Sequence, residues 1–547
     1  MYCYINMYAI GLAVVVPGDL AVWLTTRSPL STGSAVQQVT AIDIRVFRGG
    51  GTAVRRDISG YRKVLPPMAF PMSPTDAMFL VAETSKRPMH VGALALLSRP
   101  DGAGPSFVRD AFAAALDRDQ VAPLWRRRPS RALSSLGQWY WHTDAEVDLD
   151  YHVQIRALPR RAGQKALWNM VSELHAERLD RSRPLWQMHL IEGVAEGQYA
   201  LYIKTHHALA DGVSTMRLLR QTISSDPDRR GMPALWEATE HPPGDDTITS
   251  GTGISPLAAA RRVLGVAGDL AGITPALADT AWRAVRRRGG PLTLTAPHTP
   301  FSVAIDGARS FAGRGFPIDR LRLVAKHTDS TLNDVVLAMC GGALRRYLLA
   351  RHALPGAPLM AMVPVSLRVD EPAGAPDAVP GNRIGTLACC LGTHLADPAE
   401  RLAAVQASMR EGKAALAGRS QVQMLAMSAL GAIPLALAMT LGRTPGPLRP
   451  PNVMISNVPG PKEPLYWNGA RFDALYPLSV VADGQALNIT CTSINNQISF
   501  GLTGCRRAVP RIDTLADALG RELDLLDAFH RIPQTGHGRR RNPRRHK

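Results

Sequence analysis

The spacing of apolar residues along this chain alternates between the period of a helix and that of a strand. In 107–118 and 165–180, apolar side chains recur three or four residues apart, which predicts one helix in each segment. In 198–204 they occupy every second position, so Tyr199 and Ile203 share one face, as in a strand that buries one side. The chain is therefore expected to combine helices with strands.

Two further elements carry signals at their ends. Residues 331–351 have a helical pattern that begins at a threonine able to act as N-cap, with Asp334 three residues later as its capping-box partner. A hairpin is expected between 487–493 and 498–502, because an Asn-Asn pair separates these two apolar runs.

Three segments between these elements have a biased composition. Residues 225–256 and 369–381 are rich in Pro and Gly and are expected to be loops or linkers. Residues 257–290 place six arginines around apolar residues that include Trp282. This basic, partly amphipathic stretch suits contact with a membrane surface, and it suits a solvated helix about equally well.

No charged residue occurs in 420–442, which is long enough for a membrane span. Pro434 and the glutamines Gln421 and Gln423 weaken that interpretation. A buried or surface-dipping apolar helix is favoured over a transmembrane helix.

The two ends of the chain differ from its middle. Residues 1–71 include an uncharged stretch at 2–18 that lacks a basic flank and a clear cleavage site. We therefore expect a poorly structured leader or an over-long gene start rather than a signal peptide or an anchor. The tail, 531–547, ends in a cluster of basic residues. It is expected to be solvated, with contact to anionic lipid head groups as the alternative.

Composition and charge narrow the class of protein. The 547 residues are 46% hydrophobic and 20% charged, which excludes disorder over most of the chain. The mean hydropathy of −0.05 argues against a polytopic membrane protein. The net charge of +18 implies an anionic partner, such as a lipid surface or a phosphorylated cofactor. No nucleic-acid-binding module is recognisable, so no nucleic-acid partner is expected.

Several kinds of site find no support in the sequence. There is no GxGxxG, no P-loop and no GxSxG, which argues against dinucleotide binding, P-loop ATP hydrolysis and the usual serine hydrolases. The six cysteines form no CxxC pair and have no zinc-ligand spacing, so no metal is expected. Reduced thiols in the cytosol are the simplest interpretation.

The segment HHALADG, which starts at His206, carries the most chemical information. It follows the strand predicted at 198–204 and precedes a helix-like run. A histidine at a strand end can project into a cleft, and its pKa near 6.5 suits a general base at neutral pH. The two histidines are expected to point to opposite faces of an extended chain. Asp211 lies near the helix start, where a carboxylate is favoured.

Two plainer interpretations compete with catalysis at this segment. Adjacent histidines can occur by chance, and a buried histidine is ordinarily a core residue whose ring nitrogens are hydrogen-bonded. A zinc site is disfavoured, because neighbouring strand residues cannot both bind one ion and no third ligand is near. The full HHxxxDG pattern after a strand favours catalysis over both.

HHxxxDG is the signature of the acyl-CoA-dependent acyltransferase superfamily, and the chain resembles its bacterial wax ester synthase/diacylglycerol acyltransferase family over about 72–527. The supporting segments, in family order, are Met72-Ser73-Pro74-Thr75-Asp76, Pro123-Leu124-Trp125, Leu179-Asp180-Arg181-Ser182-Arg183-Pro184-Leu185-Trp186, Asn333-Asp334 and Asn457-Val458-Pro459-Gly460-Pro461.

The resemblance implies a chloramphenicol-acetyltransferase-like α/β fold. It would have two similar lobes, each a mixed sheet flanked by helices, with the active site between them. The lobes would be 72–330, which contains HHxxxDG, and 331–530. The implied enzyme is an O-acyltransferase that moves a long-chain acyl group from acyl-CoA to diacylglycerol, with long-chain alcohols as further acceptors.

The resemblance also implies roles for individual residues. His207 would be the general base, His206 would support it, and Asp211 would hold the loop through an ion pair. Asn333 and Asp334 would contact substrate, although helix capping explains Asp334 at least equally well. No cofactor is implied beyond acyl-CoA as co-substrate. The expected location is cytoplasmic, with peripheral contact to a membrane or lipid-droplet surface.

The sequence departs from the family after Tyr476-Pro477, where Leu478-Ser479-Val480-Val481-Ala482-Asp483 replaces a glycine-rich stretch. This departure bears on the choice of acceptor. Two alternatives therefore stay open. One is acylation of another lipid or polyketide alcohol, and the other is a catalytically silent lipid-binding protein with the same fold.

Overall fold

The computed structural model describes two compact units, Met1–Pro66 and Pro67–Lys547. In the first unit it describes the strands within 3–48. In the second it describes 69–531 apart from these gaps: 132–137, 160–162, 196, 240–295, 367–383, 417–430, 432 and 443–448.

The first unit contains four antiparallel strands in chain order. The stretch considered above as a leader or anchor includes the second of these strands, which covers the apolar run at 9–16. The strands are β1 (Cys3–Asn6), β2 (Ala9–Val16), β3 (Leu20–Thr26) and β4 (Ile42–Arg48).

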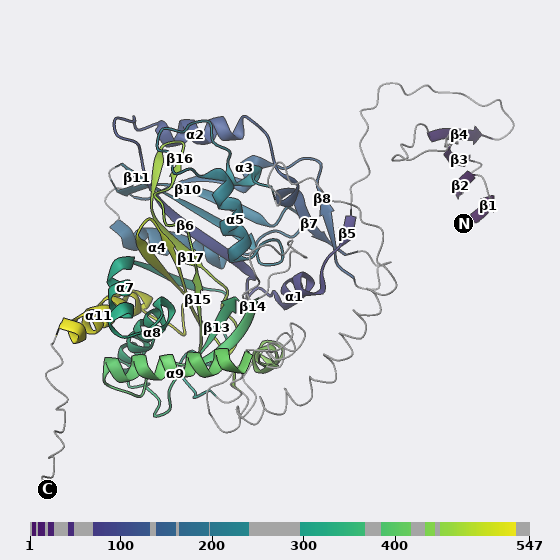
Figure 1. The fold of residues 1–547 in the computed structure, drawn as a ribbon. Helices are drawn as coiled ribbons and strands as arrows, with labels where there is room; N and C mark the ends of the chain where they lie inside the picture. The colour runs from purple at the N-terminus through teal and green to yellow at the C-terminus, as the bar shows by residue number, and fades with distance from the viewer. Residues whose placement is uncertain are drawn as a thin grey trace, which may run out of the picture. The chain divides into compact units, whose positions relative to one another are not determined.

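The second unit is built around two six-stranded mixed sheets, each with helices against it (Figure 1). We call each sheet with its helices a lobe. In the sheet of the first lobe, only the pairing of β9 with β10 is parallel. Its strands in spatial order are β16 (Tyr466–Trp467), β17 (Ala470–Leu478), β6 (His90–Ser98), β11 (Gln198–His206), β10 (Trp186–Ala195) and β9 (Val153–Ala157).

The sheet of the second lobe has two parallel pairings, which β15 makes with β13 and β18. Its spatial order is β12 (Arg309–Pro317), β19 (Gln497–Cys505), β18 (Leu487–Ile494), β15 (Val453–Val458), β13 (Met360–Ser366) and β14 (Ile384–Cys390). A small third sheet joins β5 (Ala69–Pro71), β8 (Tyr140–Thr143) and β7 (Arg127–Ser130).

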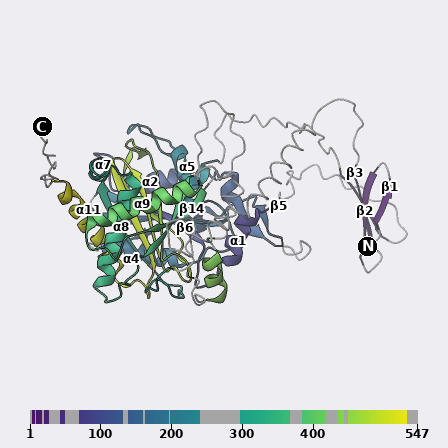
Figure 2. The same ribbon diagram turned by 60° about the horizontal axis from the view of Figure 1, so that its bottom comes forward.

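Helices cover both sheets, and α4 packs on strands of both, namely β10 and β12 (Figures 1 and 2). In the first lobe they are α1 (Pro74–Ala82), α2 (Phe107–Leu116), η1 (Pro123–Arg126), α3 (Leu149–His152), α4 (Gly163–Ala176), α5 (Gly212–Thr222) and η3 (Leu235–Glu237). In the second they are α7 (Ile318–His327), α8 (Leu332–Leu349), α9 (Pro398–Leu416) and α11 (Ile512–Arg531).

The division between the lobes differs from the boundary expected at residue 330. β12 precedes that boundary but pairs with β19 in the second sheet. β17 comes late in the chain but pairs with β6 in the first sheet, because its apolar side chains Phe472 and Leu475 complete the core there. β17 also packs on β18 and β19. A β-carbon at Gly501 of β19 would collide with the carbonyl oxygen of Pro477, so only glycine permits this approach.

The elements with the clearest local patterns are confirmed. The helices expected at 107–118, 165–180 and 331–351 are α2, α4 and α8. The strand expected at 198–204 is β11, two residues longer. The hairpin joins β18 to β19, and both turn asparagines have positive φ angles, 46° and 43°, as a two-residue type I′ turn requires.

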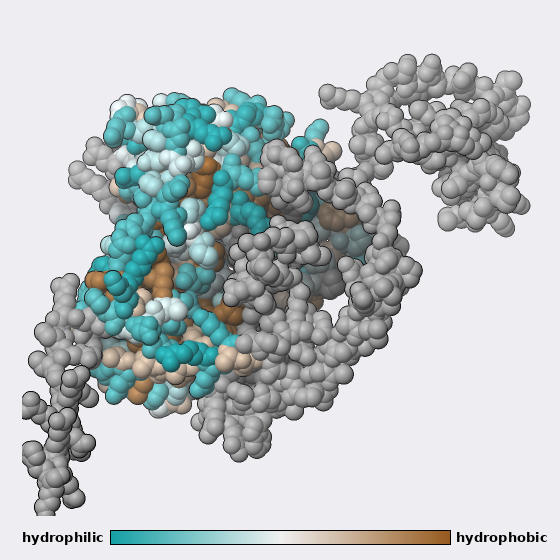
Figure 3. All heavy atoms as spheres, in the orientation of Figure 1, coloured by the Kyte–Doolittle hydropathy of each residue, from teal (hydrophilic) through white to brown (hydrophobic). Residues whose placement is uncertain are grey.

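The segments 257–290, 369–381 and 420–430 lie outside the described residues. Across the part of the chain that is described, no helix is both long and apolar enough to cross a membrane. Hydrophilic residues cover most of the visible, described face of the first lobe, with hydrophobic residues in small patches among them (Figure 3).

Candidate active site

The two histidines lie where β11, an inner strand of the first sheet, ends. His206 pairs in register with His90 of β6, and its N–H donates to the carbonyl of Leu185 at 3.0 Å. The His206 carbonyl then accepts from the N–H groups of Leu209 and Ala210, which closes the turn after the strand. The sequence placed this segment correctly between a strand and a helix.

The imidazole of His206 is fully buried. Its Nδ1 accepts the N–H of Ala208 at 3.1 Å, so the proton of the neutral ring is on Nε2. Nε2 faces Oε1 of Glu83 at 3.7 Å, which is too long for a hydrogen bond. Burial lowers the pKa of His206 to about 3, so the ring is neutral at physiological pH.

The ring of His207 is partly exposed and stacks on Phe79, with ring centroids 4.0 Å apart and an interplanar angle of 14°. Burial lowers the pKa of His207. A hydrogen bond to its own main chain and the charges of Asp211 and Asp76 act in the opposite direction. Only Nδ1 can reach the residue's own carbonyl, so Nδ1 donates and Nε2 keeps a lone pair for an incoming proton.

Asp211 is the N-cap of α5, and its carboxylate accepts the N–H of Ser214 at 2.7 Å. The hydroxyl of Thr215 donates to the main-chain carbonyl of Asp211 at 2.8 Å. These bonds tie the HHxxxDG turn to the helix that follows. The position expected near a helix start is confirmed, and the ion pair expected for Asp211 stays a prediction.

Helix α1 supplies neighbours of the histidines that the sequence did not reveal. Asp76, Phe79 and Glu83 are three and then four residues apart, so they share one face of the helix, with Glu83 as its C-cap. Asp76 acts electrostatically on His207, and Phe79 stacks on it. The SPTD segment that contains Asp76 marked family resemblance only. The helical spacing was the available signal for the other two residues.

A partly buried ion pair lies behind His206, with a glutamate that is 1% exposed and an arginine that is 33% exposed. The Glu83 carboxylate is held by the guanidinium of Arg181, whose Nε donates to Oε2 at 2.9 Å. Arg181 also donates to the carbonyl of Leu80 at 2.6 Å. The charge of the buried glutamate is therefore compensated, as a carboxylate away from water requires.

Asn333 and Asp334 lie in the first turn of α8, in the second lobe. Oδ2 of Asp334 accepts from the N–H and the hydroxyl of Thr331, at 2.9 and 2.7 Å, and the N–H of Asp334 donates back to the threonine hydroxyl. This is the capping box that the pattern predicted. Within the described residues, no hydrogen bond or ion pair joins Asp334 to the histidine pair, and the contact of Asn333 and Asp334 with substrate stays a prediction.

The segment after Tyr476-Pro477 links distant parts of the chain through Asp483. Asp483 forms a buried ion pair with Arg87 at 2.6 Å and accepts the N–H of Ile305 at 2.9 Å. It thereby connects the loop before β6 with the segment after β17. The altered residues therefore lie in a tightly bonded part of the molecule.

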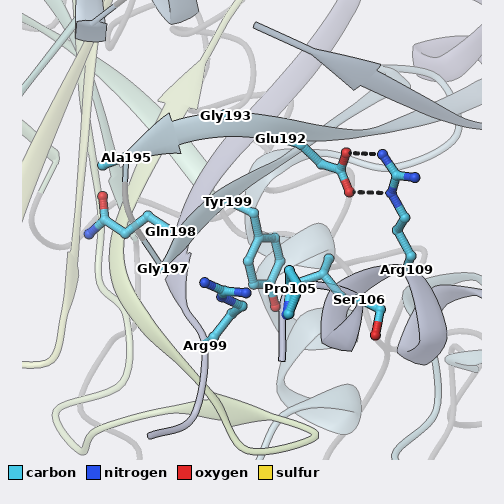
Figure 4. A pocket seen from close by; sticks show the side chains of 11 residues that line it. Arg99, Pro105, Ser106, Arg109, Glu192, Gly193, Ala195, Gly197, Gln198 and Tyr199 are labelled. Atoms are coloured by element: carbon cyan, nitrogen blue, oxygen red, sulfur yellow. Dashed lines mark hydrogen bonds and ion pairs between the residues drawn. The ribbon is translucent and has the colours of Figure 1, made fainter. Parts of the chain in front are cut away.

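A surface hollow of about 560 Å³ lies at the other end of β11 (Figure 4). Tyr199, near the start of that strand, lines it, and Arg109 and Glu192 form a bidentate ion pair at its edge. At about 3.3 Å per residue, the length of β11 separates this hollow from His207. It is therefore remote from the chemistry of the histidine pair.

Within the described residues, no group of three or more His, Cys, Asp or Glu side chains is arranged to hold a metal ion. The chemistry available around His207 is therefore that of a neutral imidazole, two nearby carboxylates and an aromatic ring.

Comparison with solved structures confirms the expected fold. The first condensation domain of the calcium-dependent antibiotic synthetase, 16% identical, matches with a TM-score of 0.51 over 85% of this chain and 98% of that domain, a likeness of fold alone. The wax ester synthase/diacylglycerol acyltransferase from Marinobacter aquaeolei, 34% identical, matches with a TM-score of 0.65 over 84% of this chain and all of that one. The fold and the histidine pair define a two-lobe, acyl-CoA-dependent acyltransferase.

The chain belongs to the wax ester synthase/diacylglycerol acyltransferase family. The model of the family's catalytic domain matches residues 72–336, and that of its C-terminal domain matches 380–527. A Mycobacterium tuberculosis protein provisionally named a diacylglycerol O-acyltransferase is 62% identical over 463 residues, which are 84% of this chain and 91% of that protein. A second one from that organism is 45% identical and covers 83% and 99%. The resemblance inferred from the sequence is confirmed.

Proposed function

We propose that this protein transfers a long-chain acyl group from acyl-CoA to the hydroxyl of diacylglycerol, with long-chain alcohols as a second class of acceptor. The observation that carries the proposal is His207: a neutral, partly exposed imidazole with a free Nε2, at the strand end where its family has HHxxxDG. Acyl-CoA is the only co-substrate, and no further cofactor takes part.

In the proposed reaction, Nε2 of His207 takes the proton of the acceptor hydroxyl as the oxygen attacks the thioester carbonyl. The tetrahedral intermediate then collapses, the C–S bond breaks, and the CoA sulfur takes the proton from Nε2 of His207, which returns the imidazole to its neutral state. One ester and one CoA thiol are formed, and no acyl-enzyme is needed. A general base of this kind accelerates a reaction by about 10²–10⁴-fold, and holding both substrates together supplies more.

We also propose that the enzyme works at a lipid surface on the cytoplasmic side. Met78 and Val81 of α1 are 60% and 70% exposed, although both are large and apolar. They lie three residues apart on one helix, which also carries Phe79 against His207. A net charge of +18 favours an anionic lipid surface.

The test compares wild type with His207→Ala, using labelled palmitoyl-CoA and either diolein or hexadecanol. We expect wild type to form triacylglycerol or wax ester, and His207→Ala to lose at least about 10²-fold in rate. His394→Ala is the matched control, because that histidine is exposed and lies in the second lobe.

Equal product from wild type and His207→Ala would exclude His207 as the base. If wild type formed ester with neither acceptor but did so with another lipid or polyketide alcohol, the acceptor class would be wrong and the reaction type would stand. No turnover with any alcohol, together with retained lipid binding, would support the silent binding protein instead.

A further inference from the structure

The buried carboxylate of Glu83 faces the ring of His206 and binds the main chain of Met89, which in turn binds His207. We propose that Glu83 is a positioning residue that holds His206 and His207 in the arrangement the reaction needs. This inference rests on the proposed function, because it takes His207 to be the base.

The two oxygens of Glu83 have separate partners. Oε2 accepts from the guanidinium of Arg181, at 2.9 Å from Nε. Oε1 accepts the main-chain N–H of Met89 at 3.2 Å and faces Nε2 of His206. The side chain is 1% exposed, so water does not compete for either oxygen. Its orientation is therefore fixed from both sides.

The first link runs to His206. Because Nδ1 of that ring accepts the N–H of Ala208, its proton lies on Nε2 and points towards Oε1 of Glu83. An N–H aimed at an acceptor oxygen is electrostatically favourable at 3.7 Å in a buried site, and the amide oxygen of a glutamine at the same reach would serve this purpose more weakly than the carboxylate. Glu83 therefore favours one tautomer and one orientation of the His206 ring, and this ring lies beneath the turn that begins at His207.

The second link runs to His207 through Met89. The N–H of Met89 is held by Glu83, and its carbonyl accepts the N–H of His207 at 2.9 Å. The position of the His207 main chain thus depends on a residue that the carboxylate anchors. Phe79 is four residues before Glu83 and stacks on the His207 ring. One helix end therefore restrains both the main chain and the ring of the base.

An ion pair that only stabilises the fold would behave differently from a positioning residue. Its contribution would depend on the charge of Glu83, whereas positioning depends on the reach of the side chain to Met89 and His206. Glu83→Gln keeps the reach and loses the charge. Glu83→Asp keeps the charge and loses one methylene of reach. The two substitutions therefore separate the two roles.

The experiment measures kcat and KM for palmitoyl-CoA in both variants and in Glu83→Ala. We expect kcat to decrease from wild type to Glu83→Gln and further to Glu83→Asp and Glu83→Ala, with a loss of about 10²-fold in Glu83→Ala and little change in KM, because small displacements of reacting groups have effects of this size. The matched control is Glu522→Gln. Glu522 is an equally buried glutamate that pairs with Arg401 and Arg346 in the second lobe.

A second measurement does not depend on turnover. Diethyl pyrocarbonate modifies accessible neutral imidazoles, and peptide mass spectrometry reports each histidine separately. In wild type and Glu522→Gln, buried His206 should be protected. In Glu83→Asp and Glu83→Ala, the space beside Nε2 should make His206 reactive.

The possible results lead to distinct conclusions. If Glu83→Asp keeps a higher kcat than Glu83→Gln, the ion pair matters rather than the reach, and the proposal is overturned. Protection of His206 in Glu83→Asp and Glu83→Ala also overturns it. If wild type makes no ester, the proposed function fails on its own, and the modification rates still decide whether Glu83 positions the pair. If Glu83→Ala does not fold, the comparison of the Gln and Asp variants decides.

Discussion

At the scale of single residues, the environment of His207 sets when it can act as a base. Burial lowers its pKa below the ordinary value, which keeps the ring neutral at physiological pH. The carboxylates of Asp76 and Asp211 favour the protonated ring and limit this shift. The proposed base is therefore available over the whole neutral range, and we expect its activity to decrease only on acidification.

Replacing Asp76 by Asn should shift this acid limit. Because the Asp76 carboxylate raises the pKa of His207, its removal lowers that pKa, and the acidic limb of kcat/KM moves to lower pH. The measurement is the pH dependence of kcat/KM for palmitoyl-CoA. Asp110→Asn is the control, since Asp110 is an exposed acid in the first turn of α2. An unmoved limb in Asp76→Asn would show that the two charges do not interact.

At the scale of elements, α1 has two faces with different tasks. One carries Phe79 and Glu83 towards the histidines, and the other exposes Met78 and Val81. A helix that binds lipid through its outer face would hold His206 and His207 next to the lipid surface that supplies the proposed acceptor. Lipid binding and catalysis would then meet in a single short element.

Polar substitutions on the outer face of α1 should weaken lipid binding. We expect the double variant Met78→Ser/Val81→Ser to bind several-fold less to anionic vesicles in sedimentation, because about 25 cal/mol is lost per Å² of apolar surface that no longer inserts. Leu323→Ser/Leu349→Ser is the control, since these leucines are similarly exposed on α7 and α8. Equal vesicle binding by both double variants and wild type would remove α1 from the lipid contact.

The sequence predicted those helices and strands whose signals lie within their own segments, and it did not predict contacts between distant segments. The helix at 331–351 and the strand at 198–204 were predicted because their periodicity and caps lie within the segments themselves. The pairing of β17 with β6 was not, since partners far apart in the chain leave no local mark. Glu83 was missed for the same reason, because its contacts to Met89, Arg181 and His206 depend on tertiary structure.

At the scale of the whole molecule, buried histidines make the fold sensitive to acid. Burial lowers the pKa values of His175, His189 and His206 to about 3, and that of His90 also decreases. The unfolded chain, with ordinary histidine pKa values near 6.5, then binds more protons than the folded one. The contribution of these neutral histidines to the free energy of unfolding is fully present above pH 6.5. It decreases as the pH falls from 6.5 towards 3.

Unfolding by urea at several pH values should show this loss. At pH 5.5, three such histidines together lower the free energy of unfolding by about 4 kcal/mol relative to pH 7.5. His189→Phe should reduce this loss between pH 7.5 and pH 5.5 by about 1.4 kcal/mol. This ring stacks on Tyr202, and neither of its nitrogens has a described hydrogen-bond partner. An unchanged slope in His189→Phe would contradict the expectation.

The late position of β17 in the chain has a consequence for folding during synthesis, because β17 pairs with the early strand β6. β6 is complete once Ser98 has been made, but its partner β17 ends at Leu478. At about 5–20 residues per second, the ribosome needs tens of seconds to make the intervening chain. Throughout that time, one edge of β6 is an unpaired template for other nascent chains. Productive folding in the cell therefore requires that this edge be shielded until β17 has emerged from the ribosome.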